Sequence, residues 1–389
     1  MNYKTAAFLD VSIGKILVNL ISLLPPFPKE LKKREHFKNI LVIKFLGIGS
    51  IIEATPLLRA LKREYPDLPI DLLTFSENKH VAESLELFRN VHVIVFRKRI
   101  FNLFFQTMRF VISKRQKYSL IIDLEFFAYF SALVTKMLSS TYSLGFEGFF
   151  NSRNRCYSRT VVFDHSNHVR FIFLKFLDSL YLKNSSDIAL SSLNISREKK
   201  ISALQKFPSL NEDGIQIAIN INSSSLCTNR RWPEENFRKL IGFIQKDYQN
   251  PQIYLVGGKE DLPSVKYFFE SLPDKKNIHI TAGKLDILEF SFALSKMALL
   301  ISSDSGPLHI AESLGIPVVG FFGPETPNLY GPLSERSFVF YRNLYCSPCL
   351  NTYNHKRSKC KDNQCLKLIT TEEVYGEMKN KHFDQKWND

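Results

Sequence analysis

The sequence predicts an α/β protein that consists of two Rossmann-like domains facing a central cleft. Three observations lead to this fold class. The chain has 389 residues, more than one ordinary hydrophobic core holds. Its 44% hydrophobic and 23% charged residues are typical of a globular protein. Short apolar runs alternate with helical patterns in two successive series, as in parallel βαβ units, and a polar link near residues 183–213 joins them.

The first segment, residues 1–38, is predicted to lie on a membrane surface. Its apolar run 11–24 is interrupted by Lys15 and Asn19 and is too short to span a bilayer. It also lacks the basic N-terminal region and the small-residue cleavage site of a signal peptide. An apolar helix beside a basic cluster is typical of an interfacial anchor; the alternative is a helix packed on the protein's own surface. The cluster comprises Lys29, Lys32, Lys33, Arg34 and Lys38.

The first series predicts a domain over residues 39–200. Its strands are expected at 39–45, 70–75, 91–96, 120–124 and 142–146. Its helices are expected at 51–65, 79–87, 101–114, 126–138 and 169–181, and residues 147–168 are expected to be irregular.

The second series predicts a domain over residues 213–370. Strands are expected at 215–221, 253–256, 278–281, 299–302 and 318–322, and helices at 233–246, 264–271, 286–295 and around His309. The last segment, residues 371–389, is expected to form a closing helix over 371–385, with Thr371 as its N-cap.

The most informative stretch, residues 299–324, combines a strand, a polar turn, a helix and a second strand. The turn is Asp304-Ser305-Gly306-Pro307, and His309 follows on the helix. Such a turn presents N–H groups at the carboxyl end of a strand, where open α/β sheets bind phosphorylated ligands. The alternative is an ordinary strand–helix–strand unit, but Asp, Ser, Gly and His together favour a site.

Further polar residues follow other strands of the second series. Ser223, Ser224 and Ser225 end its first strand, and Arg230 comes next. Hydroxyls and a guanidinium fork suit a diphosphate, the alternative being a basic surface loop. Glu260 follows the second strand and suits a ribose hydroxyl pair, unless it is simply solvated. No Asp-x-Asp pair follows a strand, so the sequence does not indicate a metal–diphosphate site.

In the first series, a glycine turn follows the first strand. Gly47 and Gly49 form it, Lys44 precedes it, and these three residues are expected to lie on the acceptor side of the cleft. A third glycine at dinucleotide spacing is missing, so NAD binding is not indicated. Glu53 lies three residues beyond Ser50 and suits a general base. The alternative is a solvated glutamate favoured by the helix dipole.

The net charge of +14 favours anionic partners. Nucleotides and anionic lipids are preferred over nucleic acid, because the sequence contains no nucleic-acid recognition module.

Four of the six cysteines cluster near the C-terminus, with a spacing close to that of a zinc ribbon. A structural zinc site, disulfides and reduced thiols are all compatible with that spacing. The absence of a secretion signal makes disulfides the least favoured of the three. The cluster consists of Cys346, Cys349, Cys360 and Cys365.

Over roughly residues 40–375 the chain resembles glycosyltransferase family nine, the heptosyltransferase-type enzymes that build bacterial lipopolysaccharide. Four blocks carry the resemblance, and the last, with its Asp-Ser-Gly-Pro-x-His core, is the most specific. They read ILVIKFLGIGSIIEATPLLRALKREYPDLPIDLLT, NRRWPEENFRKL, IYLVGGKED and ISSDSGPLHIAESLGIPVVGFFGPETP. The cysteine cluster followed by ITTEEV also recurs in the family.

The resemblance implies a GT-B fold, with the acceptor bound by the first domain and a nucleotide-sugar by the second. It implies an inverting reaction that needs no metal or other cofactor for catalysis. Asp304, Ser305, Gly306 and His309 would contact the donor's diphosphate and sugar, with Arg230 as its basic phosphate ligand. Ser223, Ser224 and Ser225 would lie near its hydroxyl contacts, and Glu260 and Leu285 beside its nucleoside.

The chain departs from the family at one position. The usual catalytic base is an aspartate directly after the glycine turn, and here Ser50 stands in its place. A serine alone is not basic enough for this role. Either Glu53 takes over as the base from the next turn, or the acceptor differs, or the activity is lost. The expected catalytic residues are Glu53, Ser50 and Asp304.

The sequence thus predicts a glycosyltransferase that moves a heptose-like sugar from a nucleoside-diphosphate donor, similar to ADP-heptose, to a lipid-linked glycan such as lipopolysaccharide. The enzyme is expected in the cytoplasm, peripheral on the inner membrane face. The alternatives are a catalytically silent nucleotide-sugar-binding homologue, which Ser50 favours, and another GT-B enzyme such as an epimerase.

Overall fold

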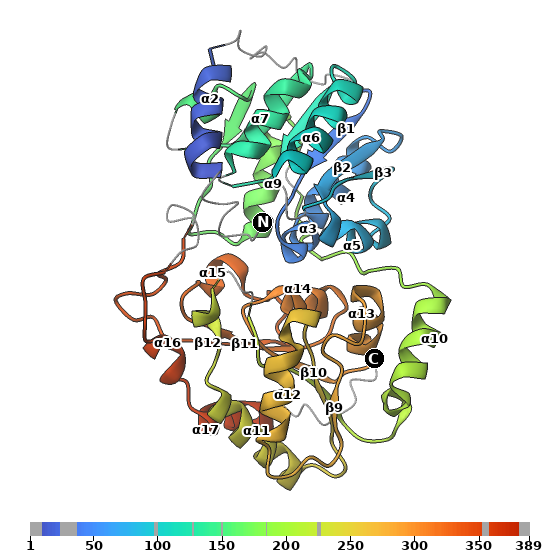
Figure 1. Ribbon diagram of the computed structural model, residues 1–389, viewed down its shortest axis with the longest axis vertical. Coiled ribbons are helices and arrows are strands. Elements are labelled where there is room, and N and C mark those ends of the chain that lie inside the picture. Colours follow the sequence, from blue (N-terminus) through green and yellow to red (C-terminus); the bar gives the residue numbers. More distant parts are fainter. Residues whose placement is uncertain are drawn as a thin grey trace. The chain divides into compact units, whose positions relative to one another are not determined.

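The computed structural model describes residues 10–23, 37–96, 100–126, 128–148, 151–183, 185–223, 227–351 and 358–380. The chain divides into two compact units between Ser191 and Ser192 (Figure 1). Each unit contains one six-stranded parallel sheet. The predicted fold class, α/β with two Rossmann-like domains, is therefore confirmed.

The sheet of the first unit has the strand order β3-β2-β1-β4-β5-β6, which is the order of a Rossmann fold. Most of its strands are buried along their whole length, because helices cover both faces of a parallel sheet. The strands are β1 (Ile40–Ile43), β2 (Ile70–Phe75), β3 (Asn90–Ile94), β4 (Leu120–Asp123), β5 (Tyr142–Phe146) and β6 (Arg159–Val161).

Most helices of the first unit connect these strands, whereas the first two helical elements precede β1 and the last helix follows β6. They are a π-helical turn at Asp10–Gly14, α2 (Lys15–Ile21), α3 (Ile48–Glu53), α4 (Thr55–Glu64), a 3₁₀ turn at Ser76–Asn78, α5 (Lys79–Ser84), α6 (Ile100–Lys114), α7 (Tyr129–Leu138), α8 (Asn151–Asn154) and α9 (Val169–Ser179).

The second unit repeats this plan with the strand order β12-β11-β10-β7-β8-β9. Its strands are β7 (Gln216–Asn220), β8 (Gln252–Leu255), β9 (Ile278–Ile280), β10 (Leu299–Ser303), β11 (Val318–Phe322) and β12 (Phe338–Tyr341). Its longer helices are α10 (Arg197–Lys206), α11 (Glu234–Asp247), α12 (Leu262–Glu270), α13 (Ile287–Ser295), α14 (Gly306–Ser313) and α17 (Thr371–Asn380). Shorter turns are α15 (Pro327–Tyr330), α16 (Gln364–Lys367) and the 3₁₀ turns at Pro208–Asn211, Thr228–Arg230 and Lys259–Asp261.

Several elements differ from the sequence prediction. The helix expected over 51–65 begins earlier and is divided at Ala54, because Pro56 starts a new helix, α4. The expected irregular stretch contains β6, and the polar link contains α10, which is capped by Ser196 and packs on α13. The edge strand β12 was not predicted. The last helix ends at Asn380 in the described part of the chain, and residues 381–385 lie outside it.

The N-terminal helix packs on the first unit through one side only. Asp10 accepts hydrogen bonds from the backbone N–H groups of Tyr129 (3.0 Å) and Phe130 (2.7 Å), at the start of α7. Val18 of α2 is fully buried against α7. Burial raises the pKa of Asp10 to about 6. Of the predicted basic cluster, Lys29, Lys32, Lys33 and Arg34 lie outside the described residues. No helix in the described ranges is long and apolar enough to cross a membrane.

Candidate active site

Each sheet has one switch point, where the strand order reverses: between β1 and β4 in the first unit, and between β7 and β10 in the second. Ligands of open α/β sheets bind at the carboxyl ends of the strands at such points. Lys44 to Ser50 follow β1, Ser223 follows β7, and Asp304 to Gly306 follow β10. The structure therefore gathers most of the predicted residues at two switch points, one in each unit.

In the second unit, a hydrogen-bonded network joins β7 to the turn after β10. Asn220 Nδ2 donates to Ser302 Oγ (3.2 Å) and to Ser305 Oγ (2.9 Å). Ser305 Oγ donates in turn to the Ser303 carbonyl (3.0 Å). The Ser305 side chain consequently forms no cap on α14, which begins at the next residue. The N-terminus of α14, with its partial positive charge, is thus the feature of this turn suited to an anion.

Arg230 and Asp304 form an ion pair at the same switch point. Arg230 Nη1 lies 2.9 Å from Asp304 Oδ2, and the two side chains are only 14% and 8% exposed. Burial lowers the pKa of Arg230, but Asp304 and the nearby Glu325 outweigh it and raise that pKa above its ordinary value. Arg230 Nε is buried and has no hydrogen-bond partner within the described ranges. A permanently charged guanidinium with an unused N–H group is well suited to a phosphate oxygen.

Trp232 fixes the segment that carries Arg230. Its indole is fully buried, stacks on Phe321 with ring centroids 4.2 Å apart, and donates from Nε1 to the Ile369 carbonyl (3.0 Å). Its backbone N–H donates to Ser303 Oγ (3.1 Å), beside Asp304. The loop and the β10 turn are therefore held to one another through the core.

Trp232→Ala is expected to lower the free energy of unfolding by about 3–5 kcal/mol, because it leaves a cavity in the core. Chemical denaturation measures this change. Tyr267→Ala, at a side chain of the same unit that is 74% exposed, is the control and should change stability little. Equal stabilities of the two variants would contradict the anchoring role of Trp232.

The remaining predicted residues of the turn are placed as follows. Ser223 is buried and its Oγ donates to the Cys227 carbonyl (3.0 Å), whereas Ser224 and Ser225 lie outside the described residues. His309 is buried on α14, 7% exposed. A Cβ atom on Gly306 would meet nothing within 4 Å, so open space lies beside the helix N-terminus.

Glu260 and Leu285 lie on two loops that touch each other. Glu260 belongs to the 3₁₀ turn after β8 and is exposed, and Leu285 precedes α13 and is half-buried. Gly283 joins the loops: its N–H donates to the Gly257 carbonyl (3.1 Å), and its φ of +71° suits glycine. These loops follow β8, which is next to β7 in the sheet, and β9, which is next to β8.

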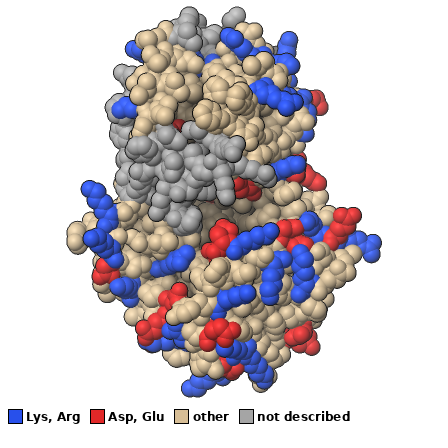
Figure 2. Space-filling model, in the orientation of Figure 1, with Lys and Arg blue, Asp and Glu red and all other residues tan. Residues whose placement is uncertain are grey.

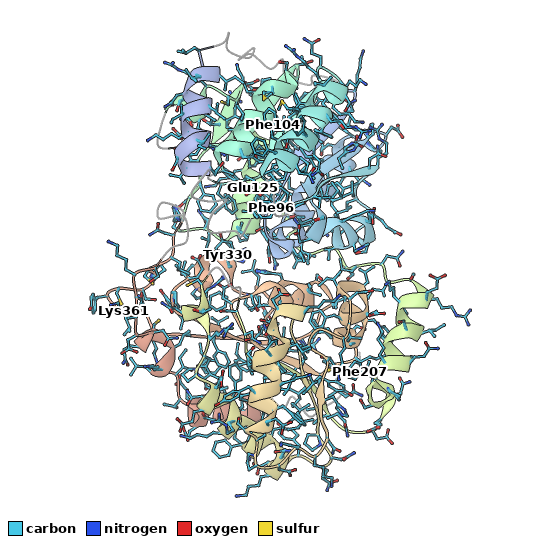
Figure 3. The ribbon with its side chains drawn as sticks, viewed as in Figure 1. Phe96, Phe104, Glu125, Phe207, Tyr330 and Lys361 are labelled. Carbon is cyan, nitrogen blue, oxygen red and sulfur yellow. The ribbon has the colours of Figure 1, made fainter. Side chains whose placement is uncertain are left out.

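In the first unit, the glycine turn runs directly into α3. Gly47 has a φ of +87° and precedes α3, so Gly49 and Ser50 lie in the first turn of that helix. Lys44 is buried, and its Nζ lies 3.1 Å from Glu125 Oε1. The same oxygen accepts from the N–H groups of Phe45 (2.7 Å) and Leu46 (2.8 Å). Glu125, labelled in Figure 3, thus holds the loop before Gly47 in place.

Glu53 lies at the end of α3 and is 1% exposed. Both of its oxygens contact Arg170 of α9: Nε–Oε2 is 2.5 Å and Nη2–Oε1 is 3.4 Å. A hydroxyl that gives its proton to Glu53 must therefore approach a carboxylate that already has a charged partner. The assignment of Glu53 as the base stays a prediction.

Within the described residues, the four clustered cysteines form no disulfide bond. Burial, and the neighbouring Cys349, Cys360 and Cys346, raise the pKa of Cys365 to about 11. Among the described residues, no three His, Cys, Asp or Glu side chains are arranged to hold a metal ion. The structural zinc at these cysteines therefore stays a prediction.

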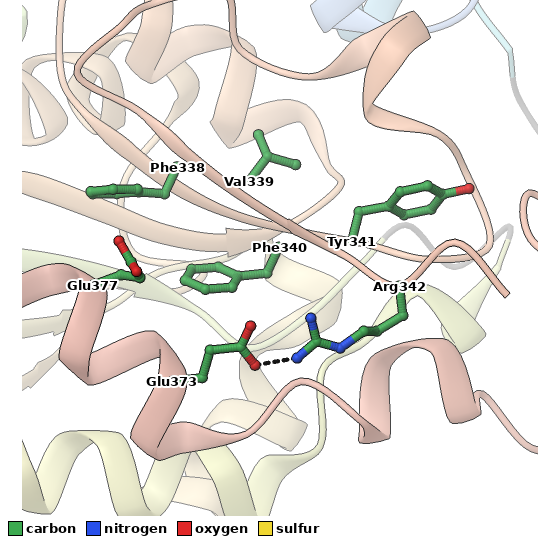
Figure 4. Close-up of a pocket in the computed structure, with 7 residues that line it drawn as sticks. All are labelled: Phe338, Val339, Phe340, Tyr341, Arg342, Glu373 and Glu377. Atoms are coloured by element: carbon green, nitrogen blue, oxygen red, sulfur yellow. Dashed lines mark hydrogen bonds and ion pairs between the residues drawn. The ribbon is translucent and has the colours of Figure 1, made fainter.

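A hollow of about 270 Å³ lies elsewhere in the second unit, between the edge strand β12 and α17 (Figure 4). Phe338 to Arg342 and two glutamates line it, and Arg342 pairs there with Glu373. None of the predicted donor residues lines this hollow, and its charges are already paired in part. We do not assign it to the donor.

Comparisons with known proteins place the chain in a family. The model of glycosyltransferase family 9 (heptosyltransferase) matches residues 112–359. Lipopolysaccharide heptosyltransferase 1 of Campylobacter coli is 24% identical over 301 residues, which cover 73% of this chain and 83% of that protein.

Two solved structures have the same fold. The family 9 glycosyl transferase of Veillonella parvula is 21% identical with a TM-score of 0.74, covering 92% of this chain and all of that one. ADP-heptose lps heptosyltransferase II of E. coli is 18% identical with a TM-score of 0.70, covering 88% and 98%. Since the family match spans more than half of the chain, the protein belongs to glycosyltransferase family 9, the heptosyltransferases, and is a glycosyltransferase.

Proposed function

We propose that this protein transfers a heptose-like sugar from a nucleoside-diphosphate donor, similar to ADP-heptose, to lipopolysaccharide or a related lipid-linked glycan. The observation that carries the proposal is the Arg230–Asp304 pair beside the N-terminus of α14 at the switch point of the second sheet. The names of the family relatives, a lipopolysaccharide heptosyltransferase and an ADP-heptose enzyme, support the choice of donor and acceptor.

The proposed reaction is a direct displacement at the anomeric carbon, which inverts its configuration. The acceptor hydroxyl attacks and loses its proton to a carboxylate of the first unit, for which Glu53 is the candidate. The bond from the anomeric carbon to the diphosphate breaks, and the diphosphate leaves with the electron pair. Arg230 and the N-terminus of α14 supply positive charge where that leaving group gains negative charge, so the proposed step requires no metal ion.

The proposal includes the place of action, the cytoplasmic face of the inner membrane, where a lipid-linked acceptor would lie. The one-sided packing of the N-terminal helix supports it.

A structural role of metal at the cysteines is a separate question. Elemental analysis of the purified protein tests it, and zinc well below one equivalent would remove that interpretation.

A second candidate function is donor binding without transfer. Ser50 favours it, because this residue of the first turn of α3 has no proton-accepting group of suitable basicity.

A thermal-shift screen of nucleoside diphosphates and their sugars tests donor binding. At a concentration about 100-fold above Kd, a ligand stabilises the folded state by about 2.7 kcal/mol, so the unfolding midpoint should rise with ADP and ADP-heptose. Product analysis then separates the candidates: glycoside supports transfer, and a midpoint shift without product supports silent binding. No shift with any nucleotide would contradict both.

A further inference from the structure

The first unit exposes an apolar surface on two helices that flank α7. Helices α2 and α6 both contact α7, and the three lie side by side within this unit (Figure 1). On α2, Ile16 and Leu20 are each 60% exposed. On α6, four outward side chains are between 57% and 77% exposed: Phe101, Phe104, Phe105 and Ile112. We call these six residues the α2–α6 face.

The exposed apolar side chains of this face are clustered, unlike the single exposed apolar side chains that are common on protein surfaces. Phe101, Phe105 and Ile112 recur at helical spacing along one stripe of α6, and Phe104 lies at the edge of that stripe. Beyond Phe104, Thr107 and Val111 are buried. Three phenylalanines exposed within five residues are costly to hydrate, and large apolar patches usually mark an interaction site. Figure 2 shows much of the described surface on the visible side of this unit as uncharged, with Lys and Arg and a few Asp and Glu along its borders. The patch therefore indicates a partner that is apolar in its interior and negative at its surface.

The charged residues of the sequence segment around α6 are all of one sign, and of these Arg89 pairs with Asp71 of β2. Residues 87–122, which include α6, contain no Asp or Glu. Of the basic residues, Arg109, Arg115 and Lys117 are exposed on α6 or directly after it. The eight basic residues in this stretch are Arg89, Arg97, Lys98, Arg99, Arg109, Lys114, Arg115 and Lys117.

We propose that the α2–α6 face docks on an anionic lipid bilayer, with its aromatic and aliphatic side chains inserted among the lipids and the exposed Arg109, Arg115 and Lys117 at the headgroups. Aromatic side chains beside lysine and arginine are typical of surfaces that lie in the membrane interface. A second copy of the chain is disfavoured, because a twofold contact would place this positive stretch against itself. The N-terminal helix predicted as an anchor is thus one half of the surface, and α6 is the other.

This inference rests on the proposed function in one respect, that the acceptor is held in a membrane. The geometry gives the face a role distinct from the switch-point sites, since none of its residues belongs to them. Loss of the face should weaken attachment to lipid and leave the chemistry itself unchanged.

Vesicle cosedimentation of the full-length protein tests the proposal. Vesicles of phosphatidylglycerol and phosphatidylcholine should bind the protein, pure phosphatidylcholine should bind it more weakly, and added salt should reduce binding. Phe104→Ser with Phe105→Ser should lower the partition coefficient about tenfold or more, because two inserted rings are lost. Leu20→Ser on α2 should lower it less, and Tyr267→Ser, at the exposed position in the second unit, should not change it.

Three outcomes would overturn the proposal: unchanged binding of the double variant, binding that is indifferent to phosphatidylglycerol and salt, or a dimer in gel filtration that the double variant converts to monomer. The last result would assign the face to a second copy. A transfer assay with a lipid-free acceptor fragment separates this from the proposed function. The double variant should keep the wild-type rate there, whereas an inactive wild type would contradict the transfer function and leave the vesicle result standing.

Discussion

Arg230→Ala is expected to lower kcat for sugar transfer by a factor of about 10²–10³, as removal of a preorganised group that stabilises leaving-group charge commonly does. The guanidinium is held by Asp304 and keeps a buried N–H group unused, so it is already oriented when the diphosphate arrives. Steady-state rates with a saturating nucleotide-sugar measure the loss. Arg230→Lys should recover only part of it, because a lysine keeps the charge without the planar fork.

The control for this prediction must separate chemistry from folding. Removal of Arg230 alone takes away the guanidinium that pairs with the buried Asp304 and interacts with Glu325, and this loss itself destabilises the fold. The double variant Arg230→Met with Asp304→Asn removes both charges of the pair. Its unfolding midpoint should return toward that of the wild type while transfer stays low. Full activity in this stable variant would contradict the donor site.

The sequence was sufficient to predict the strand, the turn and the helix of the candidate donor site, because the relevant signals are local. The turn Asp304-Ser305-Gly306 has its strand, its helix and its hydrogen-bonding groups within one βαβ unit, and short-range patterns describe such units well. The strand at Ile70–Phe75 was predicted at its observed bounds for the same reason. Family membership then confirmed the resemblance that these blocks carry.

Partners that are distant in the sequence were not predictable. Arg170 and Glu53 form an ion pair although they are 117 residues apart in the sequence. Glu125 accepts a hydrogen bond from the N–H group of Phe45, 80 residues away. Nothing in the local pattern distinguishes a glutamate that will be paired in the core from one that faces solvent. One signal was present for Glu125: it follows β4, whose neighbour across the switch point is β1. The strands β6 and β12 were not predicted for a related reason. Each has only three or four residues at a sheet edge, and so short a segment shows little hydrophobic periodicity.

Glu53→Gln is the second substitution with a large expected effect. If Glu53 accepts the acceptor's proton, the amide removes that capacity and kcat should fall by about 10²–10⁴. The amide keeps nearly the same volume and one oxygen for Arg170, so the fold should persist at reduced stability. Rate profiles over pH, with the unfolding midpoint measured beside them, give the test. Wild-type turnover in Glu53→Gln would remove Glu53 as the base.

Ser50→Asp is the complementary test of the catalytic base. It places a carboxylate in the first turn of α3, where the helix dipole stabilises a negative charge and where the family's usual base stands. In the Glu53→Gln background, this change should restore transfer if the only loss was a proton acceptor. If Glu53 instead acts by holding α9 through Arg170, Ser50→Asp should leave the double variant inactive, and Arg170→Met alone should reproduce the loss. The two patterns are exclusive, because a base can be replaced from the preceding helical turn and a structural ion pair cannot.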